Sequence, residues 1–195
     1  MTSPEQAELE RRRGIRRYLA LLRGVNVGGK NKLPMTDLAE IFTELGCSDV
    51  QTYIQSGNVV FSATPVLAKG IAPRVESAVL ERFDITSPVV LRSVEEMEAV
   101  VAQNPFLGSG ADEKQLCVAF LRARPAKRQA AALDPDRSPG DAFHLHGREI
   151  YLHLPNGAAR TKLTNEYFDR VLATTCTVRN WRTTRRLADM AASRA

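Results

Sequence analysis

The apolar residues of this chain recur in the order strand, helix, strand, strand, helix, strand, and this order occurs twice. In the first half, Tyr18–Val25 and Val89–Arg92 are apolar segments of strand length, and Val50–Gln55 and Val59–Ala63 flank the turn Ser56-Gly57-Asn58 as the arms of a hairpin. Two sets of apolar residues at helical spacing complete this half: Met35, Leu38, Ile41, Phe42 and Leu45, and then Ile71, Val75, Ala78, Val79 and Phe83.

A connecting segment follows the first six elements. Ser93 and Glu96 have the spacing of a capping box, which predicts a helix that ends before Asn104-Pro105. The next residues, Phe106–Lys114, are rich in Gly, Ser and Asp and are predicted to be a linker.

The second half repeats the element order. Its predicted strands and helices are Leu116–Leu121, Pro125–Leu133, Phe143–His146, Glu149–Leu154, Leu163–Leu172, Thr175–Arg179 and a terminal helix from about Thr183. We find no clear repeat of individual residues, so element order alone predicts the duplication. The order βαββαβ is that of the ferredoxin-like fold. We therefore predict an α+β protein of two ferredoxin-like halves in tandem: a flexible charged arm (1–17), a first half with its connecting helix (18–104), and a linker with the second half (105–195).

Composition is that of a soluble globular protein, with 44% hydrophobic and 25% charged residues. No segment approaches the roughly 20 apolar residues that span a bilayer, and the polar start lacks the apolar core of a secretory signal. The three cysteines are far apart and odd in number, which favours buried thiols in a reducing compartment. We expect a cytoplasmic protein without a membrane partner. The net charge of +5 is compatible with anionic ligands or nucleic acid but does not choose between them.

Ferredoxin-like topology brings two loops of the first half to one end of the sheet. These loops are Gly24–Pro34 and Ser56–Asn58, and we predict that they form a site for an anion. Glycines let backbone N–H groups approach a ligand, and Arg offers a planar fork to phosphate or carboxylate. The candidate ligand-binding residues are Arg23, Asn26, Gly28, Gly29, Lys30, Ser56, Gly57 and Asn58, with Lys32 beside them. The alternative is structural: the glycines turn the chain, Asn58 accepts a positive φ, and Arg23 ties loops together.

The loop is not a P-loop. Gly24-x-x-x-x-Gly29-Lys30-Asn31 has the right spacing, but Asn31 stands where the motif needs a hydroxyl for Mg²⁺. The predicted fold also lacks the parallel core of that motif.

Two segments, Leu22-Arg23-Gly24-Val25-Asn26-Val27-Gly28-Gly29-Lys30 and Gln55-Ser56-Gly57-Asn58-Val59-Val60-Phe61, together resemble the signature of a bacterial family known as domain of unknown function 1697. The resemblance runs from about Tyr18 to about Met190. It favours a ligand site over a purely structural role for the loops, and it leaves the reaction open.

A second candidate cluster lies in the second half, where the loop Pro155–Lys162 is expected to meet the end of the last strand. Its members are Arg160, Lys162, Asn165, Arg179, Asn180 and Trp181, and their surroundings also resemble motifs of the family. Trp181 could stack on a planar ligand or base, but packing is the more common role of a lone Trp. Thr164 and Asn165 could simply cap a helix.

We predict no metal site. His144, His146 and His153 lie with Tyr151 on the polar face of one hairpin, and Glu149 is the only carboxylate within it. No catalytic residues or cofactor can be assigned, so the sequence leaves open whether the protein is an enzyme. The best interpretation is binding of a small anionic ligand, such as phosphate, a nucleotide or a phosphorylated metabolite. The alternatives are an RNA- or DNA-binding protein and an interaction module without a ligand.

Overall fold

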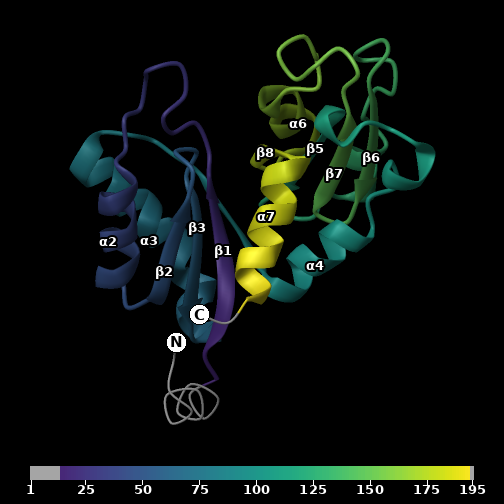
Figure 1. Cartoon of the computed structure of the whole chain (residues 1–195). Coiled ribbons are helices and arrows are strands. Elements are labelled where there is room, and N and C mark those ends of the chain that lie inside the picture. Colours follow the sequence, from purple (N-terminus) through teal and green to yellow (C-terminus); the bar gives the residue numbers. More distant parts are fainter. Residues whose placement is uncertain (1–13, 194–195) are drawn as a thin grey trace. The chain divides into compact units, whose positions relative to one another are not determined.

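The structure, a computed structural model, describes residues 14–193 (Figure 1). Most of the predicted arm therefore lies outside the described residues. The last two residues assigned to that arm belong instead to the first strand, because β1 begins at Arg16.

The first half contains one four-stranded antiparallel sheet in the order β2-β3-β1-β4. Its elements are β1 (Arg16–Leu22), α2 (Met35–Glu44), β2 (Ser48–Tyr53), β3 (Asn58–Ala63), α3 (Pro65–Phe83) and β4 (Val89–Ser93). Alternate residues of β1 and β3, such as Leu22 and Phe61, form a buried core with Phe42 of α2 and Val75 of α3. Both helices therefore cover the same face of this sheet, as the alternation of strand side chains requires.

The second half repeats this sheet in the order β6-β7-β5-β8, again fully antiparallel. Its elements are β5 (Leu116–Leu121), α5 (Lys127–Ala130), β6 (Ala142–His146), β7 (Glu149–His153), α6 (Asn165–Leu172) and β8 (Cys176–Asn180). The predicted fold class, two ferredoxin-like halves in tandem, is confirmed.

Two predicted segments differ in detail. The helix predicted over Pro125–Leu133 is limited to α5, after which the N–H groups of Ala132 and Leu133 donate to carbonyls only three residues back and the Asp134 N–H donates to Tyr167 Oη (2.8 Å). The predicted linker contains two short 3-10 helices, η1 (Leu107–Ser109) and η2 (Glu113–Gln115).

One further helix follows the fourth strand of each sheet: α4 (Val94–Ala102) follows β4, and α7 (Trp181–Ala192) follows β8. Contacts divide the chain into one compact unit made of the residues up to Glu96 with those from Leu187, and another made of Met97–Arg186. This division falls between Glu96 and Met97, whereas the sequence analysis placed the end of the first half at residue 104. It follows from the packing of each helix: Tyr151 Oη of β7 donates to the carbonyl of Val100 in α4 (3.2 Å), and the Arg17 guanidinium of β1 donates to the Ser193 carbonyl just after α7.

The strand registers show a repeat of individual residues that sequence comparison missed. Leu19 of β1 pairs with Val60 and Arg92, and Val118 of β5 pairs with Tyr151 and Arg179. With these positions aligned, four pairs are identical: Ala20 and Ala119, Leu22 and Leu121, Arg23 and Arg122, and Arg92 and Arg179. Other aligned pairs differ, namely Leu21 and Phe120, Val60 and Tyr151, and Ser93 and Asn180.

The equivalent residues also make equivalent bonds. Nη1 of Arg92 donates to the carbonyl of Leu91 (2.7 Å), and Nη1 of Arg179 donates to that of Val178 (2.9 Å), so both buried guanidinium groups bond to the preceding residue. Ser93 Oγ accepts from the N–H three residues later (3.2 Å) at the start of α4, as the capping box predicted, and Asn180 Oδ1 does the same for α7 (2.7 Å). The two halves are therefore copies of one structural unit.

No helix within residues 14–193 is both long and apolar enough to cross a membrane.

The two helix caps provide a direct test of this equivalence. We expect Ser93→Ala and Asn180→Ala each to lower the free energy of unfolding by about 1 kcal/mol, because each removes the acceptor of an N-terminal N–H. Ser77→Ala, an exposed change in the middle of α3, should cost nothing, since Ala favours helix. Urea unfolding of the three variants measures these differences. A loss for only one of the two caps would contradict their equivalence.

Candidate functional site

The two loops that sequence analysis placed at one end of the first sheet do lie together. The N–H of Leu22, at the end of β1, donates to the carbonyl of Gly57 (2.8 Å). Nδ2 of Asn26 reaches across to the carbonyl of Gln55 (2.8 Å). We call the joined segments Arg23–Pro34 and Ile54–Gly57 the first rim.

Asn26 holds the first rim together from within. Besides its bond to Gln55, its Nδ2 donates to the carbonyl of Leu33 (2.8 Å), and its Oδ1 accepts from the N–H of Leu33 (2.9 Å). Its backbone has a φ of 55°, a conformation that Asn adopts more readily than most residues. Asn31 adds a smaller brace, from its Nδ2 to the carbonyl of Gly24 (2.8 Å). The side chain of Asn26 therefore braces the loop, and all three of these bonds are made within the rim.

Gly57 and Asn58 also have structural roles. A Cβ atom on Gly57 would lie 2.6 Å from Cγ2 of Val25 and 2.7 Å from Cβ of Leu22, and the backbone φ is 69°, so only glycine fits. Asn58 is fully buried, and its Nδ2 donates to the carbonyl of Tyr53 (3.1 Å) and to Oγ of Ser56 (2.9 Å). These two predicted ligand residues close the β2–β3 turn and are covered.

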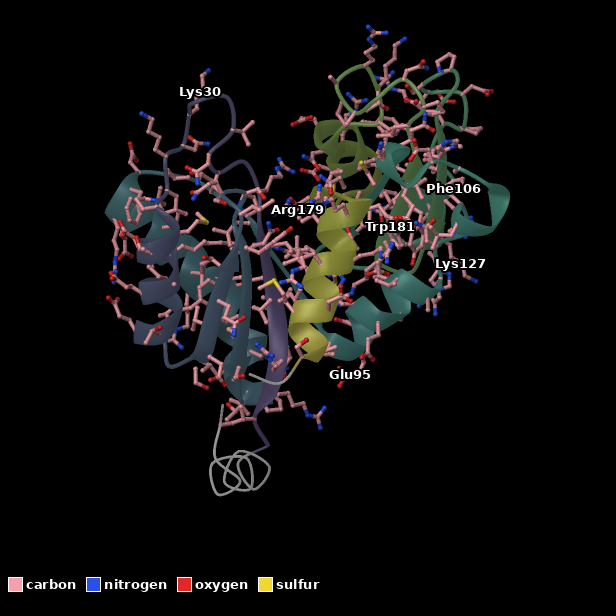
Figure 2. All side chains as sticks on the ribbon, viewed as in Figure 1. Lys30, Glu95, Phe106, Lys127, Arg179 and Trp181 are labelled. Carbon is pink, nitrogen blue, oxygen red and sulfur yellow. The ribbon has the colours of Figure 1, made fainter. Side chains whose placement is uncertain are left out.

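The exposed part of the first rim is basic and apolar at once. Lys30 and Lys32 are exposed, as are the glycines Gly28 and Gly29 that turn the chain with positive φ. Lys30 lies at the tip of the long loop (Figure 2). Val27, beside the glycines, is 63% exposed, and Ile54 in the turn is 50% exposed. Sequence analysis did not single out these two apolar residues, because an isolated Val or Ile carries no signal of its exposure.

Arg23 is partly buried at the base of the rim. Its backbone is fixed on both sides, since its N–H donates to the carbonyl of Pro88 (3.0 Å) and its carbonyl accepts from Oγ of Ser87 (2.8 Å). The Arg23 side chain therefore starts from a fixed backbone position at the base of the rim.

Ile54 has a strained backbone. Its φ is 48°, in the left-handed region that β-branched residues rarely occupy. Such a conformation costs on the order of 1–3 kcal/mol and persists only where neighbouring contacts impose it. The contacts that impose this conformation therefore keep a half-exposed isoleucine at the edge of the rim.

The second half makes the same sheet without these features. The chain passes from β5 to α5 through the short segment Arg122–Ala126, and from β6 to β7 through Gly147-Arg148 alone. The bonds that close the two ends are nevertheless equivalent: Leu121 N–H donates to the Arg148 carbonyl (2.8 Å), as Leu22 does to Gly57. The long loop and the Ile54 turn are therefore additions that the fold itself does not need.

The members of the second candidate cluster lie on different elements. Asn165, the first residue of α6, lies beside the start of β8, where its Oδ1 accepts from Sγ of Cys176 (3.3 Å), whereas Arg179 and Asn180 occupy the other end of that strand. Four strand residues separate the two ends by roughly 13 Å. Arg160 and Lys162 are exposed in the preceding loop, and the Lys162 N–H donates to Oγ of Ser138 (3.0 Å).

The remaining members of this cluster are interior residues. Arg179 is buried, its Nη1 donates to Oγ1 of Thr177 (2.8 Å), and burial lowers its pKa to about 10. Trp181 is 1% exposed, so its ring is not available for stacking on a ligand, and its indole N–H finds no acceptor among residues 14–193. Asn180 is engaged as the cap of α7.

The histidines share one face of the β6–β7 hairpin, as predicted, and part of that face is covered. His144 pairs with Tyr151, which is buried, and burial together with the charge of Glu149 raises the pKa of Tyr151 to about 12. His153 Nε2 is 3.2 Å from Oε1 of Gln115, and its ring lies 5.7 Å from that of Phe106. In the described part of the chain, no three His, Cys, Asp or Glu residues are grouped so as to hold a metal ion.

Fold and first rim define an α+β protein of two ferredoxin-like halves, the first of which carries an elaborated basic rim. The chain belongs to the family described as protein of unknown function (DUF1697), whose pattern matches residues 15–151. This match includes the whole first rim and ends before the second candidate cluster. Among solved structures, conserved bacterial protein SP0830 from Streptococcus pneumoniae is similar, with a TM-score of 0.70 and 25% identity over 91% of this chain and 99% of that one. No curated protein matches the sequence.

If Asn26 is the brace of the first rim, then Asn26→Asp should destabilise the protein. The change keeps the shape and one acceptor but removes both donors and sets a carboxylate against the carbonyls of Leu33 and Gln55. We expect a loss of about 2–3 kcal/mol in urea unfolding, as for unsatisfied buried polar groups. Asn31→Asp, which removes a single exposed brace, is the matched control and should cost clearly less. Equal losses would contradict a central role for Asn26.

The cysteines should be unreactive in the folded protein. Cys47, Cys117 and Cys176 are all buried, and burial raises the pKa of Cys47 and of Cys117 to about 11. Because the thiolate is the reactive form, we expect slow labelling by a disulfide reagent at pH 8 and complete labelling of three thiols after unfolding. One rapidly labelled thiol in the native protein would contradict this and mark a reactive site.

Proposed function

We propose that the first rim binds a small ligand that carries a phosphate or carboxylate group next to an apolar or planar part. The observation that carries this proposal is the comparison between the halves. The second half forms the same sheet with a short segment and a two-residue turn, so the long Gly- and Lys-containing loop and the strained Ile54 turn are not required for folding.

The exposed chemistry of the first rim suits the two parts of such a ligand. Lys30, Lys32 and the partly buried Arg23 supply positive charge, and the segment Arg23–Thr36 contains no acidic residue to neutralise it. Exposed backbone at Gly28 and Gly29 allows close approach of an anion. Val27 and Ile54 offer apolar contact beside these charges, as the base of a nucleotide or the body of a phosphorylated metabolite would need.

Thermal stability with added ligands tests the proposal. Inorganic phosphate, AMP and ATP are the probes. A ligand that binds only the folded state raises the free energy of unfolding by about 2.7 kcal/mol at a concentration 100 times its Kd, and the melting temperature rises accordingly. We expect AMP or ATP to exceed phosphate, because only nucleotides engage the apolar residues. The double variant Lys30→Ala/Lys32→Ala should abolish the rise. Lys69→Ala/Lys114→Ala, which removes two exposed lysines elsewhere, should leave it unchanged.

Ile54→Asn separates binding from folding in the same series. Asn tolerates the left-handed backbone, so the unliganded variant should melt higher than the parent by an amount equivalent to about 1 kcal/mol, while its response to nucleotide falls. An anion response that persists in the lysine variant, or none with any probe, would refute the proposal.

The main alternative, binding of RNA on an open sheet face, has less support. In the second half, Tyr151 on the face away from the α5–α6 side is buried and bonded to α4. The equivalent positions in the first half, such as Leu19, Leu21 and Val60, are aliphatic rather than the aromatic residues on which bases stack.

A further inference from the structure

We propose that the corresponding end of the second sheet binds the phosphodiester backbone of duplex nucleic acid, without reading its sequence. This surface consists of Arg122–Arg128, Gly147-Arg148 and the last turn of α6 with Arg170, and we call it the second rim. It is separate from the first rim, and the inference does not depend on the ligand proposed there.

Hydrogen bonds bring the three segments of the second rim together. The N–H of Leu121 donates to the carbonyl of Arg148 (2.8 Å), and Nη1 of Arg148 lies 3.4 Å from the carbonyl of Arg122. On the other side, the N–H of Ala123 donates to Oγ1 of Thr174 (3.0 Å), just beyond the C-cap of α6. The hairpin turn, the end of β5 and the end of α6 therefore form one continuous surface.

This surface is strongly basic. Its cationic residues are Arg122, Arg124, Lys127, Arg128, Arg148 and Arg170, all exposed except the partly buried Arg148. The segment Arg122–Arg128 contains no acidic residue. Two neighbouring carboxylates are engaged by backbone groups: Glu149 accepts from the N–H of Arg148 (3.1 Å), and Asp169 accepts from that of Cys176 (2.7 Å).

The distribution of charge favours an extended polyanion over a small one. The cations are spread over three segments on an exposed surface, and the long glycine loop that exposes backbone in the first half has no counterpart here. Arginine forms bidentate bonds with phosphate oxygens. Each phosphate that is neutralised along a nucleic-acid backbone releases condensed counterions, so several such contacts together raise the affinity.

The same surface lacks what the other polyanionic partners need. The large exposed apolar side chains of the described chain are Val27, Ile54, Val66, Leu80 and Leu107, and all lie outside the second rim, so nothing there would insert into a lipid surface. No aromatic residue occurs in Arg122–Arg128 or Gly147-Arg148 to stack on unpaired bases. Bonds to phosphate alone position a duplex without reading its bases.

The test is fluorescence anisotropy of a labelled 20-base-pair DNA duplex, titrated with the full-length chain at several salt concentrations. The variant Arg124→Ala/Lys127→Ala/Arg128→Ala removes three cations that no strand or core needs. We expect its Kd to rise at least tenfold at 0.1 M salt. The slope of log K against log salt should become shallower by about 2.7, which is roughly 0.9 for each phosphate that the variant no longer neutralises.

A matched control removes the same charge elsewhere. Lys69→Ala/Arg74→Ala/Arg186→Ala takes one Lys and two Arg from exposed helical positions, and its Kd should stay within twofold of the parent. All other basic residues are present in the parent and in both variants, so their contribution to DNA affinity cancels when the Kd values are compared. Unchanged melting temperatures show that the variants fold.

Three results would overturn the inference: equal weakening in the control, no weakening in the second-rim variant, or binding of a polyphosphate chain with none of the duplex. The first-rim variant Lys30→Ala/Lys32→Ala should bind the duplex like the parent. Because that variant loses only the nucleotide response, failure of either proposal is distinguishable from failure of the other.

Discussion

The side-chain amide of Asn26 is the interaction on which the first rim depends. It joins the two ends of the long loop through Leu33 and joins that loop to the neighbouring turn through Gln55. An amide is suited to this position because it offers donors and an acceptor at once and tolerates a positive φ. With Asn26 fixed, the loop backbone is already held in place, so a ligand bound there as proposed would need to order only the exposed side chains.

The two halves show how one fold can carry two different surfaces. Equivalent residues close the sheets in the same way, through Leu22 and Leu121 and through the buried guanidinium groups of Arg92 and Arg179. The loops beyond those fixed points differ in length, charge and exposure of apolar side chains. Because strand pairing and core packing are satisfied below the loops, the rims are free to vary without loss of the fold.

The fold was largely predictable because its signals are local. Alternating and helical patterns predicted the βαββαβ order of each half, and Ser93 with Glu96 predicted the start of α4. The functions of Asn26 and Asn58 were not predictable. An Asn beside glycines could face a ligand or a backbone carbonyl, and the partner that decides this for Asn26, Gln55, is distant in sequence. The residue-level repeat was missed for a related reason: the loops differ in length, so no single spacing aligns Arg23 with Arg122 and also Arg92 with Arg179.

The assignment of α4 and α7 to the two compact units has a consequence for how the chain can be divided. The helix that follows the first sheet ends in the second unit, and the helix that follows the second sheet ends in the first. A cut between the two sheets would therefore give two fragments, neither of which contains all the residues of one compact unit. The half with the first sheet would lack the residues from Leu187 onward that complete its unit, so the boundary between the sequence repeats is not a boundary between independent folding units.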